Sequence, residues 1–364
     1  MTIESMQLIP ASAESDWNRA IETTPHDFYH TAAYHRFSQD CGEGEAFLAV
    51  YGSARRYLAW PYLLRPLGSG ELRDVTSVYG YAGPLAFGCA PGDPFLDRAR
   101  DRIGRLWLSQ KVVTVFTRFH PLLENHRWAE GAPWEPPLRA PLVPGGGVHA
   151  GGVSVSIDLT RPEAATWHDY QSGLRNRIHH GRRLGLASEI DEGWSHLEDF
   201  VRFYHATMER NHALSYYFFS LDYFRRLRQA LGAHAFLLLA RLGGEIAAAG
   251  IFIEYAGSVQ NHFCVNNEQY LRLAPSKVLL DDVRRWAQER GNHVFHLGGG
   301  RGGRQDSLFG FKAAFSRRRH LFYTGRWILD PIAYHALCAG IRAAPDFFPA
   351  YRAPLAGQEG LRAI

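Results

Sequence analysis

Residues 295–316 read FHLGGGRGGRQDSLFGFKAAFS, an apolar segment followed by five glycines within six residues and then a second apolar segment. The pattern predicts a strand at 294–297, a glycine-rich turn, and a short helix that begins near Asp306. Glycines leave backbone N–H groups accessible to the oxygen atoms of a ligand. The spacing matches neither G-x-x-x-x-G-K-[ST] nor G-x-G-x-x-G. A ligand-binding turn is the better interpretation of this segment, although a tight turn has the same composition.

The residues before this segment alternate between strand and helix patterns. One long helix is predicted from an N-cap at Thr160 to about Leu184, where Gly185 provides a stop. A meander of strands should turn at Gly243-Gly244 and at Gly257. The remaining predicted elements are strands at 153–159, 235–242, 245–255 and 258–265, and helices at 196–210, 221–231 and 276–290.

The first part of the chain repeats the alternation, with a predicted hairpin at 46–50 and 57–64, helices near 14–23 and 94–109, and a buried strand at 112–119. Residues 131–152 hold five prolines and a run of three glycines, a composition that predicts a linker or long loop. We therefore expect two domains, 1–145 and 150–335, followed by a helix and tail at 336–364. The tail either packs back on the fold or meets a partner. Each domain should be α+β, with a mixed, mainly antiparallel sheet flanked by helices.

Composition narrows the class of protein. The chain has 364 residues, 46% of them hydrophobic and 21% charged, which excludes a disordered, collagenous or coiled-coil protein. No apolar run reaches the roughly 20 residues of a membrane span, and the first residues lack the basic and apolar blocks of a signal peptide. Four scattered cysteines predict a reduced, cytoplasmic protein.

Lysine is rare in this chain. Of 40 basic residues only Lys111, Lys277 and Lys312 are lysines, so arginine is the default cation. Lys312 lies in the segment quoted above, and its chemistry therefore deserves a specific explanation.

The second half resembles the FemABX-like transferases, within the wider acetyltransferase-like (GNAT) superfamily. The resemblance covers about residues 150–330, and the first half matches more loosely through YGYAGP at 79–84. It implies two GNAT-like domains that move an aminoacyl group from charged tRNA to an amine, forming a peptide bond without any other cofactor. The motifs that carry it are LRNRI at 174–178, TMER at 207–210, APS at 274–276, and LGGG, DSLF, FK and FS between 297 and 316.

The resemblance assigns the catalytic function to Phe311 and Lys312. Attack of an amine on an aminoacyl ester builds negative charge on the carbonyl oxygen, and a fixed ammonium would stabilise that charge. The ester is already activated, which agrees with the lack of a Ser-His-Asp or Cys-His signature. Asp306 either caps the Lys312 helix or assists deprotonation of the amine. A terminal adenine would stack on Phe311 or Phe315.

The predicted helix over residues 174–184 carries many basic side chains, and a second basic patch, residues 317–319, follows Lys312. Such surfaces attract nucleic acid through phosphate neutralisation, although a solvated basic face has the same composition. The residues predicted to bind tRNA are Arg175, Arg177, Arg182, Arg183, Arg317 and Arg318.

Residues 182–187, RRLGLA, match the acyl-CoA pyrophosphate pattern R-x-x-G-x-A. That loop should leave a strand and open a helix. Here it is predicted to close a helix and enter a strand, so we interpret Gly185 as a helix stop and the match as accidental.

The pocket for donor and acceptor should contain the glycine-rich turn and side chains of the helix at 196–210. The acceptor is either an antibiotic-type amine or a peptidoglycan precursor. Cell-wall members carry a phosphate-binding lysine in the first domain, where this chain has no lysine before Lys111 and Arg36 is a loose substitute. The residues assigned to this pocket are Gly298, Gly299, Gly300, Arg210, Tyr204, Tyr216 and Phe315.

Other functions remain open at this point. His293 and His296 sit at strand spacing, which sends their rings to opposite faces, and no metal site is expected. An acyl-CoA-dependent N-acetyltransferase is the first alternative, and a non-catalytic RNA-binding protein is the second.

Overall fold

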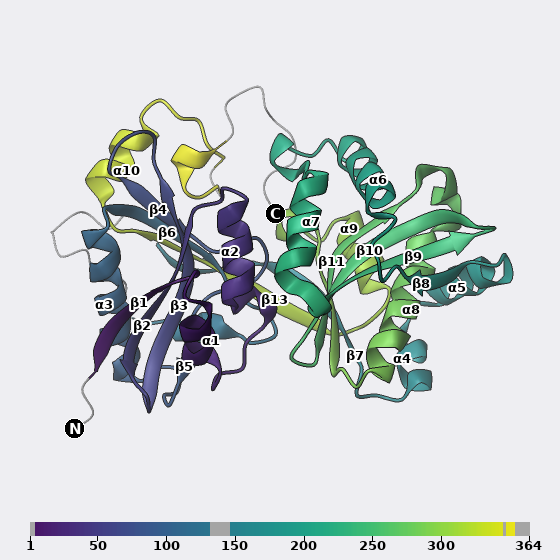
Figure 1. The fold of residues 1–364 in the computed structure, drawn as a ribbon, viewed down its shortest axis with the longest axis horizontal. Coiled ribbons are helices and arrows are strands. Elements are labelled where there is room, and N and C mark those ends of the chain that lie inside the picture. Colours follow the sequence, from purple (N-terminus) through teal and green to yellow (C-terminus); the bar gives the residue numbers. More distant parts are fainter. Residues whose placement is uncertain (1–3, 132–145, 345–346, 354–364) are drawn as a thin grey trace. The chain divides into compact units, whose positions relative to one another are not determined.

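The structure is a computed structural model that describes residues 4–131, 146–344 and 347–353 (Figure 1). It divides into two compact units. The first unit contains the described residues as far as Gly151 together with those from Phe322 onward, and the second unit runs from Gly152 to Leu321. The described residues from Phe322 to Ala353 therefore return to the first unit, whereas we expected residues up to 335 in the second domain.

The sheet of the first unit explains this return. Its strand order is β1 (Ser5–Pro10), β2 (Glu45–Ser53), β3 (Arg56–Pro66), β4 (Arg73–Thr76), β6 (Val112–Arg118) and β13 (Arg319–Ile328). β13 pairs antiparallel with β6, from Thr324 opposite Arg118 to Ile328 opposite Thr114. The pairs along the sheet are antiparallel except β4 with β6, and β5 (Leu85–Phe87) adds to β3. The predicted hairpin is β2 and β3.

One face of this sheet is covered by α3 (Pro94–Ser109), whose Trp107 packs edge-on against Trp60 of β3. A second set of aromatic side chains surrounds α1 (Glu14–Ile21) and α2 (Ala32–Asp40), where Trp17 and Tyr34 are fully buried. After β13 come α10 (Pro331–Cys338) and a short 3-10 helix, Ala350–Arg352.

The tail is anchored on the first unit. Asp74 of β4 has no exposed surface, and its carboxylate accepts hydrogen bonds from Arg65 Nε at 2.7 Å and from Arg352 Nε at 3.0 Å. Tyr351 shares the same carboxylate at 3.4 Å. A buried carboxylate requires cationic partners, so the described residues of the tail pack back on the fold.

The second unit has a related sheet. Its order is β7 (Gly147–Asp158), β12 (Val294–Gly299), β11 (Ser258–Asn266), β10 (Glu245–Tyr255), β9 (Ala235–Leu242) and β8 (Ala187–Ile190). The pairs are antiparallel except β11 with β12, which are parallel and joined by α8 (Pro275–Glu289). Both units therefore contain the predicted mixed, mainly antiparallel sheet flanked by helices.

Helices cover both faces of the second sheet (Figure 1). α8 and α5 (Ser172–Arg183) bury one face in a core that includes Phe252, Val259 and Phe295. On the other face, Phe263 of β11 contacts Tyr204 of α6 (Leu197–Arg210) and Phe224 of α7 (Leu221–Leu231).

The single long helix predicted from Thr160 to about Leu184 was wrong. The structure has α4 (Glu163–Asp169) and α5, separated by Tyr170 and Gln171 with ψ near 140°. Gln171 N donates to the carbonyl of Ala314 at 2.9 Å, and this tertiary bond holds the backbone out of the helical conformation. No local sequence signal specifies that bond.

The predicted linker was also partly wrong. Residues 132–145, which hold all five of its prolines, lie outside the described residues, but β7 already begins at Gly147. A Cβ on Gly152 would lie 2.4 Å from the carbonyl oxygen of Gly303. Glycine is used here for close backbone approach within a strand and does not break it.

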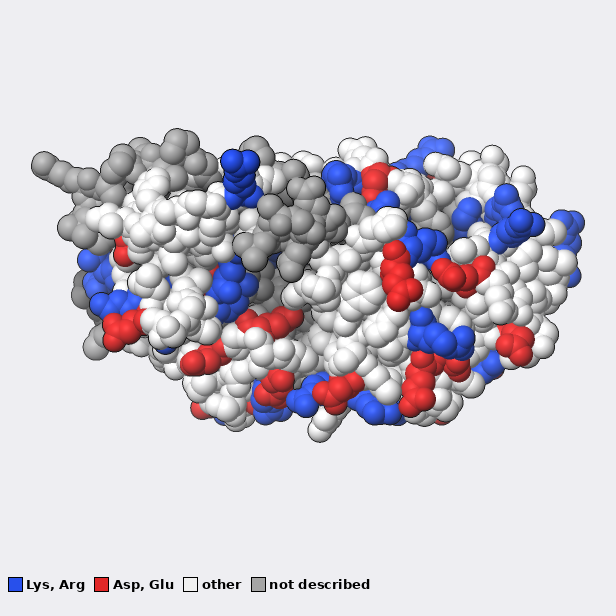
Figure 2. Space-filling view, turned by 90° about the horizontal axis from the view of Figure 1, so that it is seen from above, with Lys and Arg blue, Asp and Glu red and all other residues white. Residues whose placement is uncertain are grey.

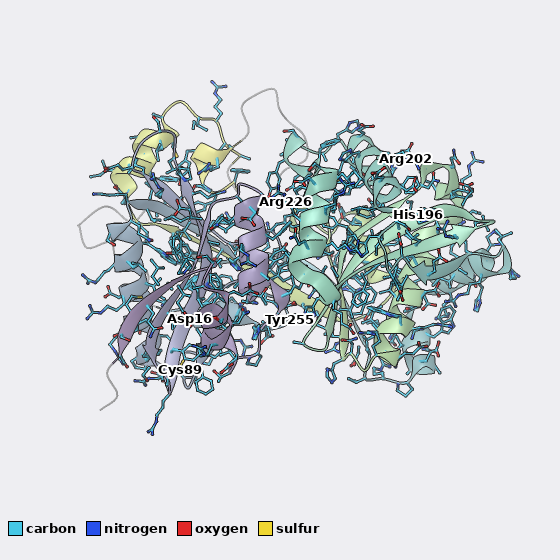
Figure 3. All side chains as sticks on the ribbon, in the orientation of Figure 1. Asp16, Cys89, His196, Arg202, Arg226 and Tyr255 are labelled. Carbon is cyan, nitrogen blue, oxygen red and sulfur yellow. The ribbon has the colours of Figure 1, made fainter. Side chains whose placement is uncertain are left out.

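All four cysteines are free thiols, and Figure 3 shows Cys89 among the side chains of the first unit. None of the described helices has the length and hydropathy needed to cross a membrane.

Candidate functional site

Lys312 lies on α9 (Ser307–Ala313), the short helix that follows the glycine-rich turn. Its ammonium donates a hydrogen bond to the carbonyl oxygen of Gly299, at the end of β12, with an Nζ–O distance of 2.8 Å. The side chain is half-buried, and desolvation lowers the pKa of Lys312 to about 8. An ammonium of this pKa is about 90% protonated at pH 7 and still has two N–H groups to donate.

The ends of two strands create the space around this ammonium. β11 and β12 pair only from Ser258 opposite Val294 to Gln260 opposite His296, and the strands then diverge. Lys312 reaches Gly299 on β12 and interacts electrostatically with Cys264 on β11. Burial raises the pKa of the Cys264 thiol to about 12, against the opposing effect of the Lys312 charge, so this thiol stays protonated.

The three glycines after Leu297 allow the backbone to pack closely around Lys312. Gly298 has φ of +79°, and a Cβ there would lie 3.1 Å from Lys312 Nζ. A Cβ on Gly299 would lie 2.7 Å from the carbonyl oxygen of Val153, and one on Gly300 would lie 1.9 Å from that of Arg304. The predicted ligand-binding turn is therefore a turn in which side chains are sterically excluded.

Asp306 caps α9, as the sequence suggested. Its Oδ1 accepts the N–H of Phe309 at 3.0 Å, and its Oδ2 accepts Arg301 Nε at 2.8 Å. Burial opposes ionisation, but the Arg301 and backbone hydrogen bonds outweigh it and hold the pKa of Asp306 below its usual value. Asp306 is thus a poor proton acceptor, and the geometry supports a positioning role. Arg301 also donates to Asn211 at the end of α6, at 3.2 Å, and so links α6 to the turn.

The two aromatic residues proposed for base stacking differ in accessibility. Phe315 has no exposed surface and packs against Tyr170 and Phe311, with ring centroids 5.3 and 5.6 Å away. Its ring faces cannot receive a base without opening the core. Phe311 remains partly exposed, so stacking stays a prediction for Phe311 alone.

Three side chains assigned to the pocket lie on α6 or on the 3-10 helix Ser215–Tyr217 that follows it, and two of them are engaged elsewhere. Tyr204 is 3% exposed, and its hydroxyl donates to the carbonyl of Tyr217 at 2.5 Å, which places it in the core. Arg210 forms an ion pair with Glu268 at 2.6 Å. Tyr216 is 53% exposed and is accessible to a ligand.

The predicted tRNA-binding arginines do not form one free surface. Arg182 is half-buried and pairs with Asp281 at 2.7 Å and with Asp282 at 2.6 Å, and Arg318 pairs with Asp158 at 2.9 Å. Basic and acidic groups are interspersed on the face shown in Figure 2. The four others make no ion pair with a carboxylate among the described residues: Arg175, Arg177, Arg183 and Arg317.

The structure confirms that RRLGLA at 182–187 is not a pyrophosphate loop. α5 ends at Arg183, Gly185 has φ of +95°, and β8 begins at Ala187. The segment closes a helix and enters a strand, so no helix start faces a ligand there.

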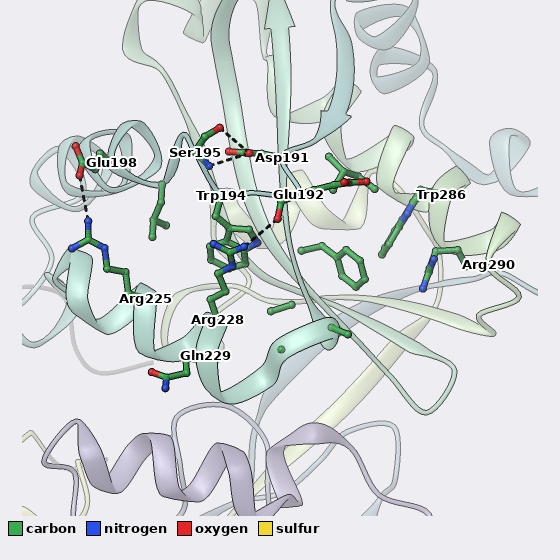
Figure 4. Close-up of a pocket in the computed structure, with 16 residues that line it drawn as sticks. Asp191, Glu192, Trp194, Ser195, Glu198, Arg225, Arg228, Gln229, Trp286 and Arg290 are labelled. Carbon is green, nitrogen blue, oxygen red and sulfur yellow. Dashed lines mark hydrogen bonds and ion pairs between the residues drawn. The ribbon is translucent and has the colours of Figure 1, made fainter.

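Sequence reasoning missed two features of the second unit. One is the position of Cys264, Asn211 and Arg301 beside the Lys312 turn, because only tertiary contacts bring them there. The other is a hollow of about 1030 Å³ where α7, α8 and β8 meet, shown in Figure 4. Its three arginines are matched by three carboxylates: Arg225, Arg228 and Arg290, against Asp191, Glu192 and Glu198.

No group of three or more His, Cys, Asp or Glu side chains suited to a metal ion occurs in the described part of the chain.

Comparison with known proteins identifies the architecture. A family profile described as an acetyltransferase (GNAT) domain matches residues 168–307. The structure is similar to that of FemX, with a TM-score of 0.64 and 11% identity, over 91% of this chain and 99% of that chain. The chain has a GNAT-type fold.

Two further structures share this fold. One is the C-terminal domain of a putative lysylphosphatidylglycerol synthetase from Agrobacterium fabrum, with a TM-score of 0.52 and 16% identity, over 86% of this chain and 91% of that one. The other is a conserved protein of unknown function from Bacteroides thetaiotaomicron, with a TM-score of 0.54 and 9% identity, over 89% of this chain and 99% of that one. No curated protein sequence matches the chain significantly. The GNAT-type fold supports an acyltransferase.

Proposed function

We propose that the protein transfers an aminoacyl group from aminoacyl-tRNA to an amine, forming an amide bond in the cytoplasm. The observation that carries the proposal is the half-buried Lys312 ammonium, held on the carbonyl of Gly299 where β11 and β12 diverge. The acceptor is an antibiotic-type amine or a peptidoglycan precursor.

The reaction needs few groups from the protein. The amine nitrogen attacks the ester carbonyl, a C–N bond forms, the C–O bond to the ribose breaks, and the proton lost by the amine passes to the departing ribose oxygen. Negative charge develops on the carbonyl oxygen, and Lys312 has two N–H groups left to stabilise it. The low pKa of Asp306 makes that carboxylate an unsuitable base. Asp306 instead fixes the start of α9 and thereby the position of Lys312.

An acyl-CoA N-acyltransferase is the second candidate, and the start of α8 is compatible with it. α8 begins at Pro275 directly after the connection from β11, and Lys277 lies in its first turn near Arg177. Burial and the Arg177 charge lower the pKa of Lys277. Two cations beside a helix N-terminus are suited to a phosphate, which both acyl-CoA and tRNA contain.

The deciding experiment compares donors. A stable amide-linked aminoacyl-tRNA analogue and acetyl-CoA are titrated against the protein over a series of salt concentrations. Tight, salt-sensitive binding of the analogue together with transfer from aminoacyl-tRNA supports the proposal, whereas binding of the coenzyme alone contradicts it. Salt-sensitive RNA binding without turnover for any donor would identify a non-catalytic RNA-binding protein.

A further inference from the structure

We propose that a second hollow of unit 2, between the start of α5 and the end of α9, binds a phosphodiester of the donor's RNA strand. This inference rests on the proposed function. The hollow has a volume of about 380 Å³ and is separate from the one in Figure 4. Three of its lining residues are arginines: Arg175, Arg317 and Arg319.

The charge in this hollow is not balanced by the protein. Its single lining carboxylate, Asp169, is already paired with Arg161. Arg175 donates to the carbonyl of His168 at 3.1 Å, and Arg319 donates to that of Ser316 at 2.6 Å. These carbonyls orient the two guanidinium groups without neutralising them. The larger hollow, by contrast, has as many carboxylates as arginines.

Arg317 is the most available of the three cations. It is exposed, and it makes no hydrogen bond or ion pair with any described residue. A guanidinium in a concave site forms two parallel hydrogen bonds with a phosphate, which is the geometry that arginine provides best. Three cations around one site without a counter-ion therefore favour an anionic ligand.

The start of α5 strengthens the attraction. Its N-cap residue, Gln171, makes no side-chain cap, and the helix is 12 residues long. Gln171 and Ser172 line the hollow, so the positive end of the helix dipole contributes to the same site as the arginines. The helix end is an addition to the arginine cluster and would not define a site alone.

The position of the hollow argues for RNA over a free anion. Ala313, the residue after Lys312, lines it, and Gln171 is hydrogen-bonded to Ala314. If the ester at the 3′ end of a strand lies at Lys312, the strand leads past the end of α9 towards this hollow. A phosphate of the same strand would then meet Arg317 while the ester stays at the ammonium.

The test measures binding of a fluorescently labelled single-stranded RNA ending in CCA by anisotropy, from about 50 to about 300 mM salt. Arg317→Ala should weaken binding roughly tenfold and reduce the salt slope by about one. Arg225→Ala is the matched control, because Arg225 belongs to an exposed ion pair with Glu198 on another helix of the same unit. Thermal unfolding of both variants checks the fold.

Two results of this binding experiment would overturn the inference. One is equal RNA affinity in the Arg317→Ala and Arg225→Ala proteins. The other is binding of inorganic phosphate, but not of the RNA, by the wild-type protein, with the phosphate binding lost in Arg317→Ala. That result would identify a free anion as the ligand.

Transfer kinetics distinguish a failure of the proposed function from a failure of the phosphate site. With aminoacyl-tRNA as donor, Arg317→Ala should raise KM and leave kcat unchanged, since Arg317 does not contact the reacting ester. Wild-type RNA binding without transfer would contradict the proposed function and leave the phosphate site intact. Transfer with an unchanged KM in Arg317→Ala would contradict the phosphate site alone.

Discussion

Lys312 Nζ lies 2.8 Å from the carbonyl oxygen of Gly299, so an ammonium on one short helix is held by the backbone of the strand that precedes it. The contact fixes the ammonium at the diverging ends of β11 and β12. It also leaves a desolvated charge with one backbone partner, which is unfavourable for stability and is retained most simply for function.

Replacement of this charge should separate activity from stability. We expect Lys312→Met to lower kcat by about 10²- to 10³-fold, the usual loss of one oxyanion-stabilising group. The same change removes a buried charge whose pKa is about 8 instead of 10.5, so the free energy of unfolding at pH 7 should rise by roughly 1–3 kcal/mol. Transfer assays and urea unfolding measure both effects. Lys111→Met, at an exposed lysine, should change neither, and wild-type turnover by Lys312→Met would refute the catalytic assignment.

The pH dependence follows from the same pKa. The folded-state pKa of Lys312 is about 8 and the unfolded value is near 10.5, so between these values the unfolded chain binds more protons. The stability of the wild type relative to Lys312→Met should therefore rise with pH, by up to about 1.4 kcal/mol per pH unit. Activity should show the opposite trend and fall above pH 8 as the ammonium loses its proton. If the residual activity of Lys312→Met falls above pH 8 in the same way, the loss of activity at high pH belongs to another titrating group.

The glycine-rich turn can be tested with one matched pair of alanine substitutions. Gly300→Ala places a Cβ 1.9 Å from the carbonyl oxygen of Arg304 and should lower the free energy of unfolding by about 2 kcal/mol or more. Gly310→Ala lies on α9 with open space around its Cβ and should stabilise the protein by about 0.5–1 kcal/mol. Chemical denaturation compares the two. Equal effects would mean that the turn relaxes to accept a side chain.

Asp306 distinguishes capping from base catalysis. Asp306→Asn keeps an oxygen that can accept the N–H of Phe309, so we expect most of the transfer activity to remain. Asp306→Ala loses the cap and should destabilise the protein by about 1 kcal/mol, with a larger loss of activity because Lys312 is displaced. A loss of about 10³-fold or more in Asp306→Asn would instead indicate a proton-transfer role.

Asp281 should be essential for holding α5 against α8. It has no exposed surface and accepts hydrogen bonds from Tyr170 at 3.0 Å, Arg182 at 2.7 Å and Arg284 at 3.1 Å. Asp281→Ala removes the buried carboxylate that these three donors share and should cost about 3–5 kcal/mol, although Arg182 keeps Asp282 and Arg284 keeps Glu163 as partners. Asp282→Ala removes only the more exposed partner of Arg182 and should cost less than about 1 kcal/mol. Similar unfolding curves for the two variants would show that the buried network does not stabilise the unit.

Local sequence patterns predicted most elements because their causes are local. Asp93 and Pro94 start α3, continuous apolar runs mark β9 and β10, and Asp306 caps α9. Elements whose limits depend on distant contacts were missed. The break between α4 and α5 depends on the carbonyl of Ala314, and the extension of β7 to Gly147 was concealed by the adjacent glycines and prolines.

The sequence by itself determined the mixed sheets, the glycine-rich turn and the selection of Lys312 as the candidate catalytic residue. Hydrophobic periodicity, a run of glycines and a rare residue type are all local features of the sequence. Only the tertiary structure decided which arginines remain without a carboxylate partner and which aromatic rings stay accessible. Arg182 and Phe315 resemble Arg317 and Phe311 in sequence, but Asp281 neutralises the first and the core encloses the second. Charge pairing and burial depend on residues far away in the sequence. Arg182 and Asp281 are 99 positions apart, and Asp74 and Arg352 are 278 positions apart, so local composition does not encode such partners.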